Sequence, residues 1–363
     1  MKIAQVAPLA ESVPPQLYGG TERIVSYLTE ELVREGHEVT LFASGDSATS
    51  AELVAVTQRA LRLDPDVIDP LALSMVLLER VAAEVKRFDV VHFHFDHTQY
   101  GYMRRLDAPA VATMHGRMDL PELVTLFEEY SEIPLVSISD AQREPLPDLN
   151  WLATVYHGLP MEQIPVFPDP GSYLAFLGRI SPEKRLDRAI EIAQRSRLPL
   201  KVAAKVDEVD REYFETEIQP LITGEVEFVG EIADNEKDAF LGNAAALLFP
   251  IDWPEPFGLV MIEAAARGTP VVAFRFGSVP EVIEDGVTGV VVDDVEQAVA
   301  AIPDVLALPR QAVREAAVRR FSAKRMAHDY VSVYGRLIEG NAEPEGAARV
   351  PAAATLASEV MAD

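Results

Sequence analysis

Short apolar runs alternate with longer amphipathic segments along most of this chain of 363 residues. Runs that are apolar at every position are typical of strands in parallel sheets, because both faces of such a sheet are covered. Helix-period segments between the runs indicate right-handed crossovers, so the pattern predicts doubly wound α/β sheets. The predicted strands are Lys2–Val6, Glu38–Ala43, Val90–Phe93, Ala110–Met114, Leu135–Ser137, Ala153–Tyr156, Tyr173–Gly178, Leu200–Ala204, Val226–Val229, Ala246–Pro250, Pro270–Phe274 and Gly289–Val292. The predicted helices are Thr21–Glu35, Leu71–Lys86, Glu183–Arg195, Asn235–Asn243, Gly258–Arg267 and Val295–Leu306.

The alternation is interrupted at residues 157–172, where several Pro residues and a Gly break regular structure. Since a domain typically has roughly 100–200 residues, we expect an N-terminal Rossmann-like domain at 1–165 and a second one at 166–322. Ligands of this fold bind beyond the carboxyl ends of the strands, which places a ligand in a cleft between the domains. Residues 341–363 are rich in Ala, Pro and Glu, and we expect them to pack weakly.

The formal net charge of -26 disfavours nucleic acid and anionic membranes as partners, because both are negatively charged. The chain has no Cys, so disulfides, thiolate metal sites and cysteine nucleophiles are excluded. No apolar run reaches the ~18 residues of a membrane span, and Met1–Val6 is too short for the apolar core of a signal peptide. We therefore expect a cytoplasmic protein without membrane association.

The segment from Pro254 to Ala273 has the most specific pattern in the chain. Glu255 lies between two prolines, and a helix is expected to begin near Phe257 or Gly258. Unpaired amides at a helix start carry partial positive charge and can hold a phosphate. Glu263 falls on the second turn, so two carboxylates flank the phosphate site and can bind hydroxyl pairs.

This arrangement fits a nucleotide sugar, with the diphosphate in the middle, the ribose diol on one side and the hexose hydroxyls on the other. The alternative is a surface helix with two solvated glutamates. The apolar residues Val260, Met261 and Ile262 and the buried strand after the helix argue for a packed location instead.

A basic pair, Arg179 and Lys184, lies within Gly178–Lys184 at the predicted strand-to-helix turn of the second domain. Two fixed cations at the carboxyl side of the sheet could neutralise a diphosphate, including the charge that grows as it leaves. The alternative is ordinary solvated surface charge.

Consecutive glycines, Gly19 and Gly20, occur in the segment Tyr18–Arg23 before the first predicted helix. Glycines at a helix N-terminus suggest phosphate contact. The segment lacks the full dinucleotide fingerprint, so a plain tight turn remains the alternative.

His115 follows the predicted strand Ala110–Met114 and precedes Gly116. The carboxyl end of a strand is where a cleft residue of this fold belongs. A lone His at a strand end is also commonly structural, and both interpretations stay open on the residues alone.

Together these four segments resemble family 4 of the retaining glycosyltransferases, which have the GT-B fold of two Rossmann-like domains facing a central cleft. The similarity runs over most of Met1–Leu337, and its specific part is the Glu-x7-Glu element from Glu255 to Glu263. Gly36–Val39 and Gly178–Lys184 are moderately specific. The family's last helix usually crosses back to the first domain, which the resemblance implies for residues 323–340.

The resemblance also implies roles for individual residues. The implied catalytic residues are His115, Arg179, Lys184 and Glu255. The implied donor-binding residues are Gly19, Gly20, Arg179, Lys184, Ile232, Glu255, Phe257, Gly258, Leu259, Val260 and Glu263. Within this set, Glu255 would bind the sugar hydroxyls and Glu263 the ribose diol, with Ile232 at the base. Arg179 and Lys184 would bind the diphosphate, and His115 would contact the sugar near the reacting carbon.

The reaction implied is transfer of a hexose from a nucleoside-diphosphate sugar, with a UDP-sugar favoured, to the hydroxyl of an unidentified acceptor. It would retain the anomeric configuration by front-face displacement, with neither metal nor cofactor. Ile251 and Asp252 stand where the family usually has a small polar residue, so the motif does not predict the sugar. The sequence also leaves the oligomeric state open.

A rival interpretation rests on His92-Phe93-His94-Phe95-Asp96-His97, which matches the His-x-His-x-Asp-His pattern of zinc-dependent metallo-β-lactamase-like hydrolases. The strand around His92 and the doubly wound repeat argue against that β-sandwich class. Two further alternatives are an enzyme of the same fold with other nucleotide-sugar chemistry, such as epimerisation, and a non-catalytic sugar-binding protein.

Overall fold

The computed structural model describes residues 1–16, 19–62, 64–95, 97–169 and 171–340, and within these residues the strands form two sheets. The strands of the first sheet are β1 (Lys2–Val6), β2 (Glu38–Ser44), β3 (Glu52–Thr57), β4 (Val90–Phe93), β5 (Ala110–Thr113), β6 (Leu135–Ser137) and β7 (Trp151–Thr154). The strands of the second sheet are β8 (Tyr173–Ile180), β9 (Leu200–Val206), β10 (Val226–Gly230), β11 (Ala244–Phe249), β12 (Val271–Phe274) and β13 (Gly289–Val292).

The helices are α1 (Gly20–Arg34), α2 (Pro70–Glu84), α3 (Tyr100–Met103), α4 (Pro121–Glu129), α5 (Leu186–Ser196), α6 (Arg211–Tyr213), α7 (Lys237–Gly242), α8 (Leu259–Ala266), α9 (Val279–Val282), α10 (Val295–Leu306), α11 (Arg310–Phe321) and α12 (Ala323–Ile338). None of the helices in these described ranges is long and apolar enough to cross a membrane.

Both sheets are parallel and doubly wound, with orders β3-β2-β1-β4-β5-β6-β7 and β10-β9-β8-β11-β12-β13. The strand order reverses beside β1 in the first sheet and beside β8 in the second. Loops that leave the carboxyl ends of strands at such a switch point form the ligand site of this architecture. In this chain those loops lead into α1 and α5.

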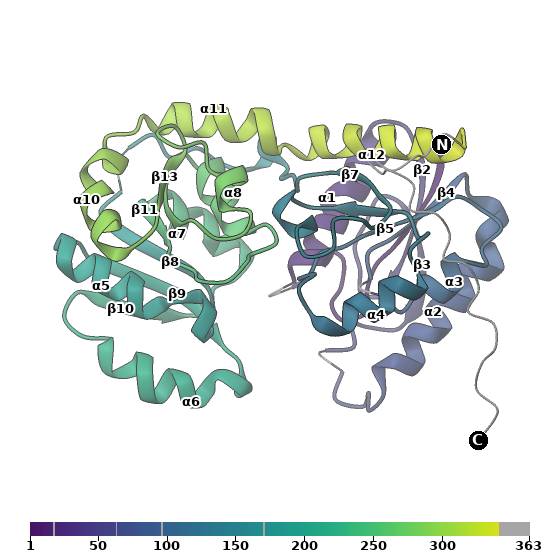
Figure 1. Ribbon diagram of the computed structural model, residues 1–363, viewed down its shortest axis with the longest axis horizontal. Helices are drawn as coiled ribbons and strands as arrows, with labels where there is room; N and C mark the ends of the chain where they lie inside the picture. Colours follow the sequence, from purple (N-terminus) through teal and green to yellow (C-terminus); the bar gives the residue numbers. More distant parts are fainter. Residues whose placement is uncertain (17–18, 63, 96, 170, 341–363) are drawn as a thin grey trace, which may run out of the picture.

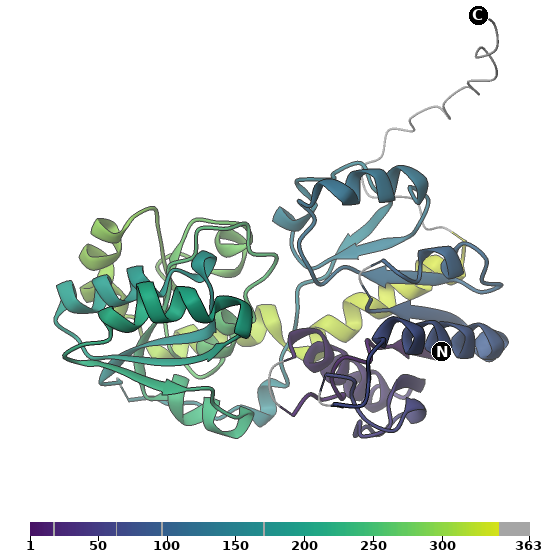
Figure 2. The same cartoon turned by 90° about the horizontal axis from the view of Figure 1, so that it is seen from below.

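Figure 1 shows the two domains side by side, with α11 along one and α12 along the other. Helix α12 packs against α1, and its residues Tyr330 and Tyr334 are buried in a core cluster with Ile24 and Leu28 of α1. The turned view in Figure 2, seen from below, shows α12 extending from the junction along the far side of the N-terminal domain. The last described helix is therefore part of the first domain's core.

The two connections between the domains run side by side. The Leu159 amide donates to the Phe321 carbonyl at 2.8 Å, and the Ala323 amide donates to the Leu159 carbonyl at 2.7 Å. A Cβ on Gly158 would lie 2.5 Å from the Ser322 carbonyl oxygen, so the close approach requires Gly. The domains are joined by a short hydrogen-bonded pair of segments.

The structure differs from the sequence prediction in several local features. Helices α3, α4, α9 and α11 were not predicted. Strand β3 was not predicted either; it is an edge strand with exposed and half-buried positions around an apolar centre. Strand β7 is Trp151–Thr154, two residues earlier than predicted. Helix α8 begins at Leu259, because Gly258 has a left-handed φ of 77° and is therefore the N-cap residue, outside the helix.

Candidate active site

A cavity of about 640 Å³ lies between the two domains and is lined by residues of both. Its lining includes each residue to which the sequence analysis gave a donor-binding or catalytic role: Gly19, Gly20, His115, Arg179, Lys184, Ile232, Glu255, Phe257, Gly258, Leu259, Val260 and Glu263. The structure thus brings the whole predicted set to one site, and the individual roles stay predictions. Tyr18, the first residue of the glycine segment, lies outside the described residues.

The N-termini of α1 and α8, one from each domain, meet at this cavity. A Cβ on Gly20 would lie 3.5 Å from Leu259 Cδ1, so the two helix starts are in close proximity. Gly258 has a left-handed backbone, and a Cβ there would lie 2.6 Å from Met261 Cε. Free amides of both first turns add partial positive charge to the cavity, which suits an anionic ligand.

Lys184 and Glu255 form an ion pair within the cavity. The Lys184 ammonium and the Trp253 indole N–H both donate to Glu255 Oε2, the latter at 3.0 Å. The ammonium also lies 4.9 Å from the centre of the Trp253 ring, within cation–π range. Lys184 and Trp253 therefore fix the orientation of the carboxylate that was predicted to bind sugar hydroxyls.

Arg179 lies within β8 instead of in the turn after it, and it pairs with Glu183 at 2.8 Å. Burial opposes ionisation of Glu183, but hydrogen bonds and Arg179 outweigh burial and lower its pKa. The Arg179 side chain is 40% exposed, so its guanidinium remains accessible to a ligand in the cavity.

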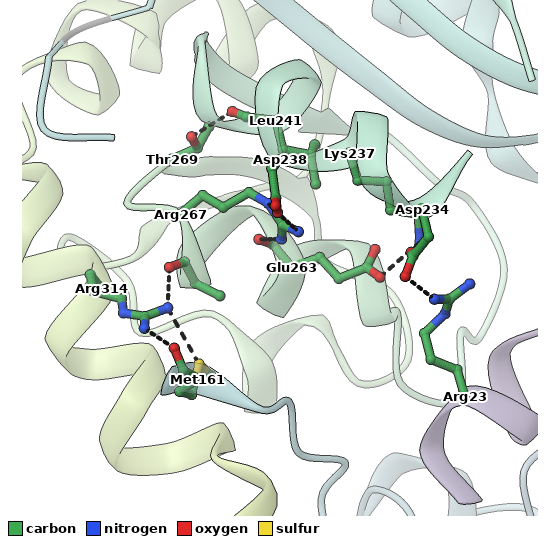
Figure 3. Close-up of polar contacts among 11 residues, drawn as sticks. Arg23, Met161, Asp234, Lys237, Asp238, Leu241, Glu263, Arg267, Thr269 and Arg314 are labelled. Carbon is green, nitrogen blue, oxygen red and sulfur yellow. Dashed lines mark hydrogen bonds and ion pairs between the residues drawn. The ribbon is translucent and has the colours of Figure 1, made fainter. Parts of the chain in front are cut away.

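Glu263 is buried on α8, and Lys237 donates to its Oε1 at 3.0 Å. Burial opposes ionisation of this carboxyl, but Lys237, Arg23 and Arg267 together lower its pKa. It is therefore held as a carboxylate at the wall of the cavity. Figure 3 shows the polar contacts around it, including Arg23, which reaches Asp234 from the N-terminal domain.

His115 contacts a second buried histidine, with 3.0 Å between His94 Nδ1 and His115 Nε2. Burial lowers the pKa of His115 to about 3, so the ring is neutral near pH 7. Its Nδ1 is buried and has no hydrogen-bond partner among the described residues. A neutral imidazole with an unpaired nitrogen suits an uncharged hydroxyl better than a phosphate.

Two histidines of the rival zinc site, His92 and His94, are hydrogen-bonded within the protein core, whereas His97 is exposed. His92 uses both nitrogens, one with the Tyr334 hydroxyl and one with Thr113 Oγ1, each at 2.7 Å. His94 Nε2 contacts Gln5 Oε1 at 2.7 Å. Asp96 lies outside the described residues, and no group of three or more His, Cys, Asp or Glu side chains elsewhere in the described ranges could hold a metal ion. The hydrolase interpretation is thus without support.

Several residues of the cavity wall were not predicted from the sequence. They are Arg23, His94, Arg117, His157, Asp234, Lys237 and Trp253. Arg23 closes the predicted glycine segment and Trp253 directly precedes Pro254, so nearness to a motif was the available signal. Arg117 likewise follows His115 closely, and His94 was noted only as part of the rival zinc motif. His157, Asp234 and Lys237 lack a sequence signal, because they reach the cavity through the packing of the domains.

Two family models match the chain in succession. One, described as Glycosyltransferase Family 4, matches residues 18–154, and the other, Glycosyl transferases group 1, matches residues 161–320. The chain belongs to the family 4 glycosyltransferases. The fold is the GT-B fold, as the sequence predicted.

Individual relatives agree with this family. Glycogen synthase of Mycobacterium tuberculosis is 27% identical over 372 residues, covering 87% of this chain and 89% of that protein. The solved structure of AviGT4, a glycosyltransferase involved in avilamycin A biosynthesis, has a TM-score of 0.72 at 25% identity, covering 94% of this chain and 98% of that one. The Anabaena protein Alr3699/HepE in complex with UDP has the same fold, with a TM-score of 0.70 at 18% identity and coverage of 92% and 100%.

Proposed function

We propose that this glycosyltransferase moves a hexose from a nucleoside-diphosphate sugar to an acceptor hydroxyl, with retention of the anomeric configuration and without a metal ion. The observation that carries the proposal is the composition of the single cavity described above. Two helix N-termini line it together with several cations, Arg179 and Lys184 among them, and several carboxylates, Glu255 and Glu263 among them, and both domains contribute. Those groups correspond to the charged and hydroxylated parts of a nucleotide sugar.

The neighbours of the two carboxylates support one orientation of the donor. Glu263 lies beside Lys237, and it takes the ribose diol, with Ile232 of the same cavity wall at the base. Glu255 lies beside Trp253 and takes the hexose hydroxyls. The diphosphate then lies at the start of α8, within reach of Arg179 and Lys184. UDP is the nucleotide we favour, because the Anabaena protein of the same fold was crystallised with it.

In the proposed reaction the bond from the anomeric carbon to the diphosphate oxygen breaks and a bond to the acceptor oxygen forms on the same face. The acceptor proton passes to the departing diphosphate. Arg179, Lys184 and the amides of α8 stabilise the negative charge that develops on the leaving group. His115, being neutral, contributes hydrogen bonding to the sugar and no counter-charge.

Retention can be tested without knowing the natural acceptor. UDP-α-glucose is incubated with the enzyme and a panel of simple sugar acceptors, and proton NMR follows the first product before any mutarotation. We expect an α-linked product, because both bonds change on one face. A β-linked product would contradict the proposed reaction, and the Glu255→Gln enzyme serves as the inactive control.

A further inference from the structure

Four side chains of alternating charge run from the N-terminal domain to the predicted ribose site (Figure 3). Arg23 of α1 pairs with Asp234 Oδ2 at 2.6 Å, and Lys237 lies 3.3 Å from Asp234 Oδ1. Lys237 in turn contacts Glu263 at 3.0 Å. Each of the two inner residues therefore bridges two partners, and the series joins one domain to the other.

Within the C-terminal domain, further contacts hold in place the two helices that carry Lys237 and Glu263. Arg267, at the end of α8, binds Asp238 of α7 with two nitrogens, at 3.0 and 2.5 Å. The same guanidinium donates to the Glu263 carbonyl at 2.6 Å. Helices α7 and α8 are thus held together at the positions that carry Lys237 and Glu263.

Arg23 comes from the opposite domain and is deeply placed, with its side chain only 6% exposed. A buried cation requires a well-formed partner, because the desolvation cost of an unpaired charge is large. Asp234 supplies one partner across the cavity, and the Tyr27 hydroxyl and the Glu263 carboxylate also interact with this guanidinium. The contact between Arg23 and Asp234 therefore exists only when the domains lie close together.

We propose that Arg23 is a positioning residue, acting through Asp234 and Lys237 to orient the Glu263 carboxylate for the ribose diol. This inference rests on the proposed function, since it takes Glu263 as the ribose ligand. Arg23 fixes the position of Asp234, and Asp234 in turn holds the Lys237 ammonium against Glu263. Without Arg23 or Asp234, the Lys237 ammonium is no longer held in place and Glu263 loses its fixed orientation. In this way a residue of the N-terminal domain completes the ribose site, which lies in the C-terminal domain.

The test is a double-mutant cycle read by calorimetry with UDP. Arg23→Gln and Asp234→Asn should each weaken UDP binding by about fivefold to thirtyfold, within the usual range of coupling between sites. The UDP affinity of the double variant should lie within about twofold of the affinity of the single variant that binds UDP more weakly, because both changes break the same contact. Arg23→Lys, which keeps the charge, should recover most of the affinity.

Arg34→Gln is the matched control on the same helix. Arg34 lies in the last turn of α1, where it pairs with Glu31 and does not line the cavity. This variant should bind UDP as the unmodified enzyme does. A second check is the exchanged pair Arg23→Asp with Asp234→Arg, which should bind UDP more tightly than either of its single components.

The outcomes separate this inference from the proposed function. If the unmodified enzyme binds none of UDP, GDP and ADP, the proposed function fails. If it binds one of them and Arg23→Gln binds that nucleotide equally well, only the positioning role of Arg23 is overturned. Additive losses in the double variant would also overturn it, because Arg23 would then act on the ligand without Asp234.

Discussion

Two glutamates eight positions apart occupy different surroundings at one helix start. Glu255 precedes α8 and is fixed by Lys184 and Trp253. Glu263 lies on the second turn of α8, buried against Lys237 and close to charges from both domains. The spacing of the two glutamates does not by itself distinguish them. Their different neighbours in the structure indicate that each carboxylate binds a different part of the donor.

This difference predicts separate effects of mutation. Glu255→Gln keeps the size of the side chain but removes its charge, so turnover of the intact donor should collapse while binding of UDP stays near normal. Glu263→Ala removes the acceptor for the ribose diol, so UDP affinity should fall about tenfold to a hundredfold, as expected for charge-assisted hydrogen bonds. Calorimetry with UDP and turnover with the intact donor separate the two. Equal losses of UDP affinity, or none in either variant, would show that the assignment is wrong.

At the scale of elements, helix α12 is tied to the first sheet by buried hydroxyls. The Tyr334 hydroxyl accepts from Gln5 Nε2 at 3.0 Å and contacts His92 Nδ1 at 2.7 Å. The Tyr330 hydroxyl contacts Thr113 Oγ1 at 2.9 Å. Three strands, β1, β4 and β5, are therefore bound to a helix that follows the second domain in the chain.

Removing one of these hydroxyls should destabilise the fold. Tyr334→Phe leaves the side chains of Gln5 and His92 each without one buried partner, at a cost of about 1–3 kcal/mol for each unsatisfied group. Chemical denaturation should show this loss in the free energy of unfolding. Ser332→Ala, an exposed change on α12, is the control and should have little effect. Equal stability of Tyr334→Phe and the unmodified enzyme would mean that water replaces the lost contacts.

The elements also show what sequence reasoning could reach. Strands β1, β4 and β6 were predicted to the residue, because most of the positions in these buried parallel strands are apolar. Strand β3 was missed although residues 53–56 form an uninterrupted apolar run between Glu52 and Thr57. The residues of the local motifs all line one cavity and their roles stay predictions, whereas Asp234 and Lys237 were not predicted, since Asp234 meets Arg23 from about two hundred residues earlier in the chain.

For the whole molecule, contacts between the domains occur on more than one side of the cavity. Glu281 of α9 accepts from the amides of Asp140 and Ala141, both at 2.7 Å, and from the Tyr156 hydroxyl at 3.1 Å. Arg23 and Asp234 form another contact between the domains. Because the paired connections at Leu159 and Phe321 are short, these contacts control how closely the domains approach. A ligand that touches both domains should therefore stabilise the entire chain.

The last prediction concerns that stabilisation and its independence of metal. UDP at about 100 times its dissociation constant should add about 2.7 kcal/mol to the free energy of unfolding, because it binds only the folded state. The increase in melting temperature should be the same with and without excess EDTA, since Arg179, Lys184 and the amides of two helix starts supply the positive charge from the protein itself. Uridine, which lacks the phosphates, is the control and should stabilise much less. If EDTA abolished the effect of UDP and Mg²⁺ or Mn²⁺ restored it, the diphosphate would depend on a metal ion and not on these cations alone.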